Sequence, residues 1–152
     1  MEVTRIRALR GPNLWSHHTA IQSVVACTEQ ESCISKIDGF EARVRARFPE
    51  ISPFQPTGHA DAIPMAHVLE LAALGLQAQA GCPVTFSRTT LTIDAHVYQV
   101  VVEYSEEEVG QLALALAQTL CQSAADNTPF DLAGALTQHR DLDEDVRLGP
   151  FF

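Results

Sequence analysis

The residue pair whose types and spacing best suit catalysis is His67 and Glu70, three positions apart in the apolar run PMAHVLELAALGLQ. On a helix, residues at i and i+3 lie on one face, so this imidazole and this carboxylate can point the same way. In the pattern H-x-x-E-H, two histidines one turn apart bind zinc and the glutamate acts as general base. Here Leu71 occupies the fifth position, so the second histidine of this pattern is missing.

A carboxypeptidase-type H-x-x-E site remains open, because both residues are then zinc ligands and a distant histidine completes the set of three. His59 and His96 are the candidates for that third ligand. The alternative is structural, because the run around the pair is apolar on nearly all sides and such a helix is buried. The residues favour the structural alternative, in which His67 and Glu70 are hydrogen-bonded in the core.

Other residues of the sequence indicate a chemical function less specifically than His67 and Glu70 do. Arg88 interrupts an apolar strand-like segment, so its guanidinium must reach solvent or an acidic partner such as Glu103 on the neighbouring strand. Structural pairing and ligand recognition both fit that position. Neither a phosphate-binding G-x-x-x-x-G-K or G-x-G-x-x-G loop nor a nucleophile elbow G-x-S-x-G occurs in the chain. The residues alone therefore indicate no complete catalytic site.

Composition limits the class of partner. The chain has 152 residues, enough for one compact domain with its own core, and its formal net charge is −9. That balance argues against a nucleic-acid surface, which needs clustered positive charge, and fits a cationic or mixed-charge partner. Nine of the ten basic residues are arginine, which is compatible with recognition of carboxylates, although a high-GC genome is the favoured explanation.

No membrane span or signal peptide is predicted, because no apolar run approaches the roughly 18 residues that a span requires and the N-terminus carries charges. The four cysteines form no C-x-x-C pair. They are typical of reduced, mostly structural thiols, and we expect a cytoplasmic protein.

The elements that must position these residues follow from periodicity and from turn residues. Strands are expected over 2–10, 20–28, 84–93 and 97–104, the last two joined as a hairpin. Helices are expected from an Asp38 N-cap to residue 48, from Pro64 to the Gly81 stop, after a capping box at Ser105–Glu108, and more weakly over 130–140. Residues 49–60 read as a loop. The order β-β-α-α-β-β-α-α predicts an α+β fold, a single two-layer domain with a mainly antiparallel sheet packed with helices.

Several segments resemble the N-terminal domain of cyanophycin synthetases. They are LRGPNLW (9–15), AHVLELAAL (66–74), FSRT (86–89), YQVVVEY (98–104), SEEEVG (105–110) and LCQS (120–123). The resemblance extends over essentially the whole chain, in order and with similar spacing. Its most specific anchors are the R-G-P-N-x-W element, the Y-Q-V-V-x-E-Y strand and the L-C-Q-S helix end.

The resemblance implies a cytoplasmic, ATP-dependent ligase that builds a polyaspartate backbone and attaches arginine to each side chain by an isopeptide bond. Ligation, with ATP and magnesium, belongs to later ATP-grasp and Mur-ligase-like domains, which we expect to follow the domain at 1–152 in a longer, homo-oligomeric protein. The exposed end Phe151–Phe152 fits a domain cut from such a protein. The N-terminal domain itself is implied to hold the polymer and to need no cofactor.

Some members of the family carry, in this domain, a metal-dependent site on an H-x-x-E-H helix that cuts the polymer and supplies primers. This chain departs from that pattern at Leu71, so we expect no hydrolysis and assign neither catalytic residues nor a metal. Two alternatives to simple polymer binding stay open. One is a zinc-dependent hydrolase that uses His67 and Glu70, and the other is a module for docking or oligomerisation.

Polymer binding would need both signs of charge, because each polymer unit offers a guanidinium and a free carboxylate. Glu103, Glu107 and Glu108 are the candidates for the guanidinium groups, and Arg10 and Arg88 for the carboxylates. One exposed ion pair contributes only about 0–1 kcal/mol, so useful affinity requires many repeats engaged together. Such binding should weaken as salt is added.

Overall fold

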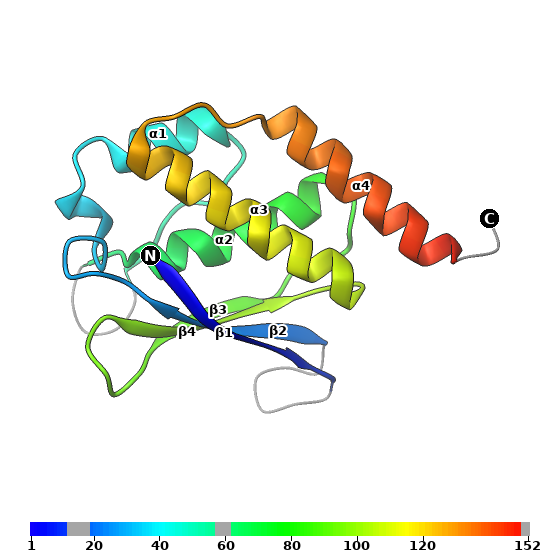
Figure 1. Ribbon diagram of the computed structural model, residues 1–152, viewed down its shortest axis with the longest axis horizontal. Helices are drawn as coiled ribbons and strands as arrows, with labels where there is room; N and C mark the ends of the chain where they lie inside the picture. The colour runs from blue at the N-terminus through cyan, green and yellow to red at the C-terminus, as the bar shows by residue number, and fades with distance from the viewer. Residues whose placement is uncertain (12–18, 57–61, 150–152) are drawn as a thin grey trace.

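A four-stranded antiparallel sheet forms one layer of the domain (Figure 1). The computed structural model describes residues 1–11, 19–56 and 62–149. The strands are β1 (Glu2–Leu9), β2 (Ala20–Ala26), β3 (Ser87–Leu91) and β4 (Val97–Glu103), in the order β1-β2-β4-β3. Every neighbouring pair is antiparallel. Helices connect β2 to β3 and follow β4, so the predicted α+β fold and its order of elements are confirmed.

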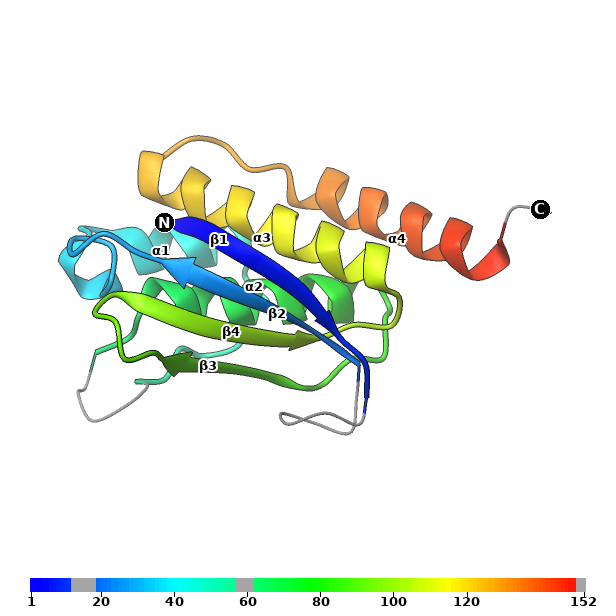
Figure 2. The ribbon, with the colours of Figure 1, turned by 60° about the horizontal axis from the view of Figure 1, so that its bottom comes forward.

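The helices form the second layer, and in the described residues they all lie on one side of the sheet (Figure 2). They are α1 (Phe40–Arg47), α2 (Met65–Gln79), α3 (Glu107–Asp126) and α4 (Leu132–Leu148), with a short 3₁₀ helix η1 (Ile34–Lys36) before α1. Helix α2 packs over β3 and β4, and α3 packs on α2 and β2. Helices α1 and α4 contact α3. The opposite face of the sheet is therefore the one that helices leave open.

The core lies between the sheet and helices α2 and α3. Side chains alternate between the two faces of a strand, so Ile21 and Val25 of β2 and Val100 and Val102 of β4 meet the helices. Helix α2 is buried on most sides, as its composition predicts. Burying one such side chain contributes about 1.5–3 kcal/mol, so this layer contact supplies much of the stability of the domain.

Two predicted helix starts are wrong. Helix α1 does not begin at an Asp38 cap; Gly39 is the N-cap residue, and its φ of 70° is a left-handed conformation that glycine adopts cheaply. Helix α3 lacks the predicted capping box, because its N-cap is Glu106, without a side-chain cap bond. The hydroxyl of Ser105 instead donates to Asp143 of α4 at 3.4 Å. A tertiary contact therefore replaces the local cap.

Two predicted boundaries also shift. Strand β3 is limited to Ser87–Leu91, shorter than the predicted 84–93. Helix α4 extends to Leu148, well beyond the predicted end at residue 140. It continues through the acidic segment because Ala135, His139 and Asp143, spaced four apart, form a buried face while the neighbouring residues lie at the surface.

Candidate functional site

Helix α2 holds the His67–Glu70 pair inside the domain, where it forms a closed hydrogen-bond network. His67 is 8% exposed and Glu70 is 4% exposed. The Nδ1 atom of His67 lies 2.7 Å from one carboxylate oxygen of Glu70. The hydroxyl groups of Ser87 and Thr89, both on β3, donate to the same carboxylate at 2.7 Å each. The pair thus joins α2 to the edge strand of the sheet.

The electrostatics of Glu70 agree with this structural role. Burial alone raises the pKa of a carboxyl group, but hydrogen bonds from His67, Thr89 and Ser87 outweigh it, so the pKa of Glu70 is below its usual value. Its two oxygens accept three hydrogen bonds in all. Both oxygens of this carboxylate are therefore engaged within the domain.

Both ring nitrogens of His67 are also occupied. The backbone N–H of Gln55 donates to Nε2 at 3.3 Å, so the ring proton of the neutral imidazole lies on Nδ1 and is donated to Glu70. In the described residues no three His, Cys, Asp or Glu side chains are grouped as metal ligands would be, so His96 does not complete a set with this pair. His59 lies outside the described residues. With Leu71 at the second histidine position, this donor set does not fit a zinc site.

The thiols do not form a nucleophilic site either. All four cysteines are free, and Cys27, Cys82 and Cys121 are buried. Burial raises the pKa of the Cys27 thiol to about 11 and that of Cys121 to about 12, which keeps both protonated at neutral pH. The burial of three of the four cysteines fits the predicted structural role, and the expectation of reduced thiols stays a prediction.

The open face of the sheet gathers charged side chains from three strands. We define this open face by the outward residues Arg5, Arg7, Gln22, Val24, Arg88, Gln99, Val101 and Glu103. One row across the sheet runs Arg7–Gln22–Val101–Arg88, with an arginine at each end. The guanidinium of Arg7 donates to the Gln22 amide oxygen at 2.8 Å. The arginines of the open face are thus exposed, whereas Gln22 and Val101 between them are buried.

Arg88 and Glu103 do share this face, as the sequence suggested. Arg88 is paired in register with Val101, so Glu103 is its diagonal neighbour two residues further along β4. Arg88 is exposed, whereas Glu103 is 6% exposed and accepts from the backbone N–H of Thr85 at 3.2 Å. Arg88 thus lies at the surface of this face, while one oxygen of Glu103 is held by the domain.

The remaining predicted charges lie near one end of the sheet. Glu107 and Glu108 are exposed in the first turn of α3, just after β4. Arg10 follows β1 and is exposed. Burial raises the pKa of the Tyr104 phenol; Glu107 raises it further and Arg10 lowers it, so both charges lie near that ring. The structure brings Arg10, Glu103 and Glu107 to this end of the sheet. The Pro12, Asn13 and Trp15 part of the R-G-P-N-x-W element lies outside the described residues.

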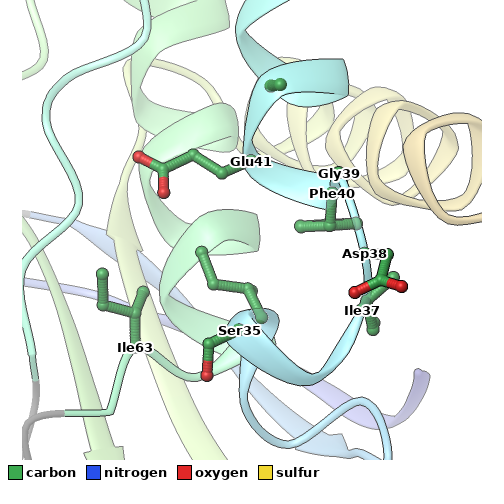
Figure 3. A pocket seen from close by; sticks show the side chains of 9 residues that line it. Ser35, Ile37, Asp38, Gly39, Phe40, Glu41 and Ile63 are labelled. Atoms are coloured by element: carbon green, nitrogen blue, oxygen red, sulfur yellow. The ribbon is translucent and has the colours of Figure 1, made fainter.

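Two cavities accompany these groups. A groove of about 490 Å³ lies on the open face at the end distant from Glu103, between Arg5 of β1 and Asp94 of the β3–β4 turn. A second cavity of about 280 Å³ lies where η1 meets the start of α1 and Ile63, on the helical side (Figure 3). Glu41 borders that second cavity and is already paired with Arg45 at 3.2 Å. Compared with Glu41 at the second cavity, the charged side chains of the groove on the open face are less engaged by other side chains of the domain.

The sequence reading missed Arg5, Arg7, Asp94 and Gln99 as functional candidates. The signal was present, because strict alternation in EVTRIRAL places Arg5 and Arg7 on one face of the strand. Asp94 could not be placed in the same way, because it lies in a turn whose position depends on the pairing of β3 with β4.

No helix in the described parts of the chain is both long and apolar enough to cross a membrane.

Comparison with known proteins agrees with these features. The family model described as the cyanophycin synthase-like N-terminal domain matches residues 22–126. The cyanophycin synthetase of Trichormus variabilis is 33% identical over 99% of this chain, and that of Geminocystis herdmanii is also 33% identical over 99%. The cyanophycin synthetase of a Synechocystis species is 31% identical over 99%. The chain spans 18% of the first of these relatives and 19% of the other two. The chain therefore belongs to the family of cyanophycin synthase-like N-terminal domains.

Proposed function

We propose that this domain binds cyanophycin, the polyaspartate polymer with an arginine on each side chain, and tethers it for elongation. The observation that carries the proposal is the open face of the sheet, on which the exposed Arg5, Arg7 and Arg88 accompany the carboxylate of Asp94. Each polymer unit has a free carboxylate and a guanidinium, so it complements a surface that has both charges. Charge-assisted, two-pronged pairs between guanidinium and carboxylate are the strongest exposed contacts available to it.

The spacing on β1 supports an extended polymer that lies along the strands. Arg5 and Arg7 are two residues apart on one face, which is about 6.8 Å along a strand. An extended polyaspartate backbone presents every second side chain on the same side, with that same repeat. Alternate polymer units can therefore reach successive arginines without a change of register.

Charged side chains near both ends of the sheet could also pair with the charges of the polymer. Arg10, Glu103 and Glu107 lie at one end, and Arg5 with Asp94 at the other. One exposed pair contributes only about 0.2–1 kcal/mol, so a single unit should bind weakly. Several units held at once gain affinity through effective concentration, which suits a tether that must release and re-bind as the polymer grows.

In this proposal the domain contributes binding, and the ligation chemistry lies elsewhere. ATP and magnesium would act in ligase domains of a longer protein, whose amide-bond formation consumes ATP. The four free thiols fit a reducing compartment such as the cytoplasm. The occupied nitrogens of His67 and the occupied oxygens of Glu70 favour this role over hydrolysis.

The proposal predicts selectivity between two polymers. Isothermal titration of the 152-residue chain with short synthetic cyanophycin segments should give saturable binding, whereas polyaspartate of equal length should bind at least about tenfold more weakly. The reason is that polyaspartate lacks the guanidinium groups and repels a chain whose net charge is −9. Equal affinity for both would contradict the proposal. No binding of either would favour a docking or oligomerisation module.

A further inference from the structure

The groove at the Arg5 end of the open face combines two opposite charges with polar side chains and two valines. Its lining includes Arg5 of β1, Val24 of β2, Val97 and Gln99 of β4, and Asp94 of the β3–β4 turn. Its volume is about 490 Å³. It is shallow and open to solvent, as a site for a unit within a long chain must be.

The two charges in this groove are not used by the fold. Within residues 1–11, 19–56 and 62–149, neither the guanidinium of Arg5 nor the carboxylate of Asp94 has an ion-pair or hydrogen-bond partner. Other arginines are committed: Arg45 pairs with Glu41 and Arg147 pairs with Asp143. Two opposite, uncommitted charges across one groove indicate a ligand that itself has both charges.

The turn that places Asp94 is held in a defined shape. The hydroxyl of Thr92 donates to the carbonyl of Val97 at 2.9 Å and accepts the backbone N–H of Asp94 at 3.2 Å. His96 has a φ of 64°, the left-handed conformation that closes the turn toward β4. The backbone of Asp94 is therefore held at the rim of the groove before any ligand arrives, which lowers the entropic cost of ordering the turn on binding.

We infer that this groove is the subsite for one arginyl side chain of the polymer, with its carboxylate on Arg5 and its guanidinium on Asp94. The inference rests on the proposed function and adds to it the place and orientation of a single unit. The methylene groups of the side chain lie over Val24 and Val97, and the amide of Gln99 offers a donor and an acceptor to the isopeptide bond. Plain polyaspartate offers only carboxylates and oligoarginine offers mainly guanidinium groups, so each can pair with only one of the two charges of the groove.

Two matched ligands test the two contacts separately. In the first, the arginyl carboxylates of a synthetic segment of a few units are amidated; in the second, citrulline replaces arginine, which removes the positive charge and keeps the shape. Arg5→Ala should weaken binding of the native segment by roughly two- to fivefold, and it should leave the affinity for the amidated segment unchanged. Asp94→Asn should likewise weaken binding of the native segment, and it should leave the affinity for the citrulline segment unchanged. Each combination of one variant with two ligands is a double-mutant cycle, which isolates the interaction between one residue and one ligand group.

Arg140→Ala, which removes an exposed arginine of α4 on the helical side, is the matched control and should not alter binding of any segment. If Arg5→Ala weakens the native and amidated segments equally, or neither, the assignment of the carboxylate to Arg5 is wrong. The same holds for Asp94 with the citrulline segment. If the unmodified chain binds no segment at all, the proposed function itself fails, an outcome distinct from binding that ignores these two residues.

Discussion

Glu70→Ala should lower the free energy of unfolding by about 3 kcal/mol, the largest effect that we expect from one polar residue. The substitution removes a carboxylate that accepts hydrogen bonds from His67, Ser87 and Thr89 at 2.7 Å each. These three donors are then left without that partner in a buried site between α2 and β3. Urea unfolding followed by circular dichroism measures the loss.

The matched control is Glu108→Ala, because Glu108 is an exposed glutamate in the first turn of α3 and should change the stability by no more than about 0.5 kcal/mol. Acidification provides a second measurement. The pKa of Glu70 is lowered in the folded protein, so its contribution is full above the ordinary glutamate pKa and is lost as the pH falls through the lowered value. Glu70→Gln should therefore lose less stability on acidification than the unmodified chain. A loss below about 1 kcal/mol for Glu70→Ala would contradict the network.

Arg7→Glu with Arg88→Glu should weaken binding of cyanophycin segments by about 100-fold, the largest functional effect that the proposal predicts. The two arginines end one row across the open face, so both lose a carboxylate contact and both then repel the arginyl carboxylates. A tenfold loss for each corresponds to about 1.4 kcal/mol, slightly more than one exposed pair contributes, because repulsion is added. Isothermal titration measures the loss.

The control for that pair is Lys36→Glu with Arg140→Glu, which changes the net charge equally at two exposed positions on η1 and α4. It should reduce the affinity no more than about twofold, because it acts only through the overall field. If both double variants weaken binding to the same extent, net charge and not the open face governs the interaction.

The fold was largely predictable because its signals are local. The β-branched residues of β2, β3 and β4 and the apolar run of α2 each indicate one element, and the element order then selects an α+β fold. The errors arose where tertiary contacts prevail over local ones. Ser105 bonds to Asp143 of α4 and does not cap α3, and η1 moves the start of α1 to Gly39.

The candidate site was predictable only in part, for a related reason. Spacing alone placed His67 beside Glu70, but whether that pair is free to bind a ligand depends on Ser87, Thr89 and Gln55, which are distant in the sequence. Likewise the charges of the open face come from strands whose order, β1-β2-β4-β3, is set by long-range pairing. Residue types suggested the chemistry, and only the sheet shows which charges lie together.

The most direct test of polymer binding by the open face is a titration of the 152-residue chain with cyanophycin segments at increasing salt. Between about 50 mM and 500 mM sodium chloride, the Debye length falls from about 14 Å to about 4 Å, so contacts between exposed charges are progressively screened. We predict that the affinity falls steadily over this range and that Arg7→Glu with Arg88→Glu reduces the salt dependence. Binding that stays equally tight at high salt, or a double variant with an unchanged salt dependence, would contradict the account.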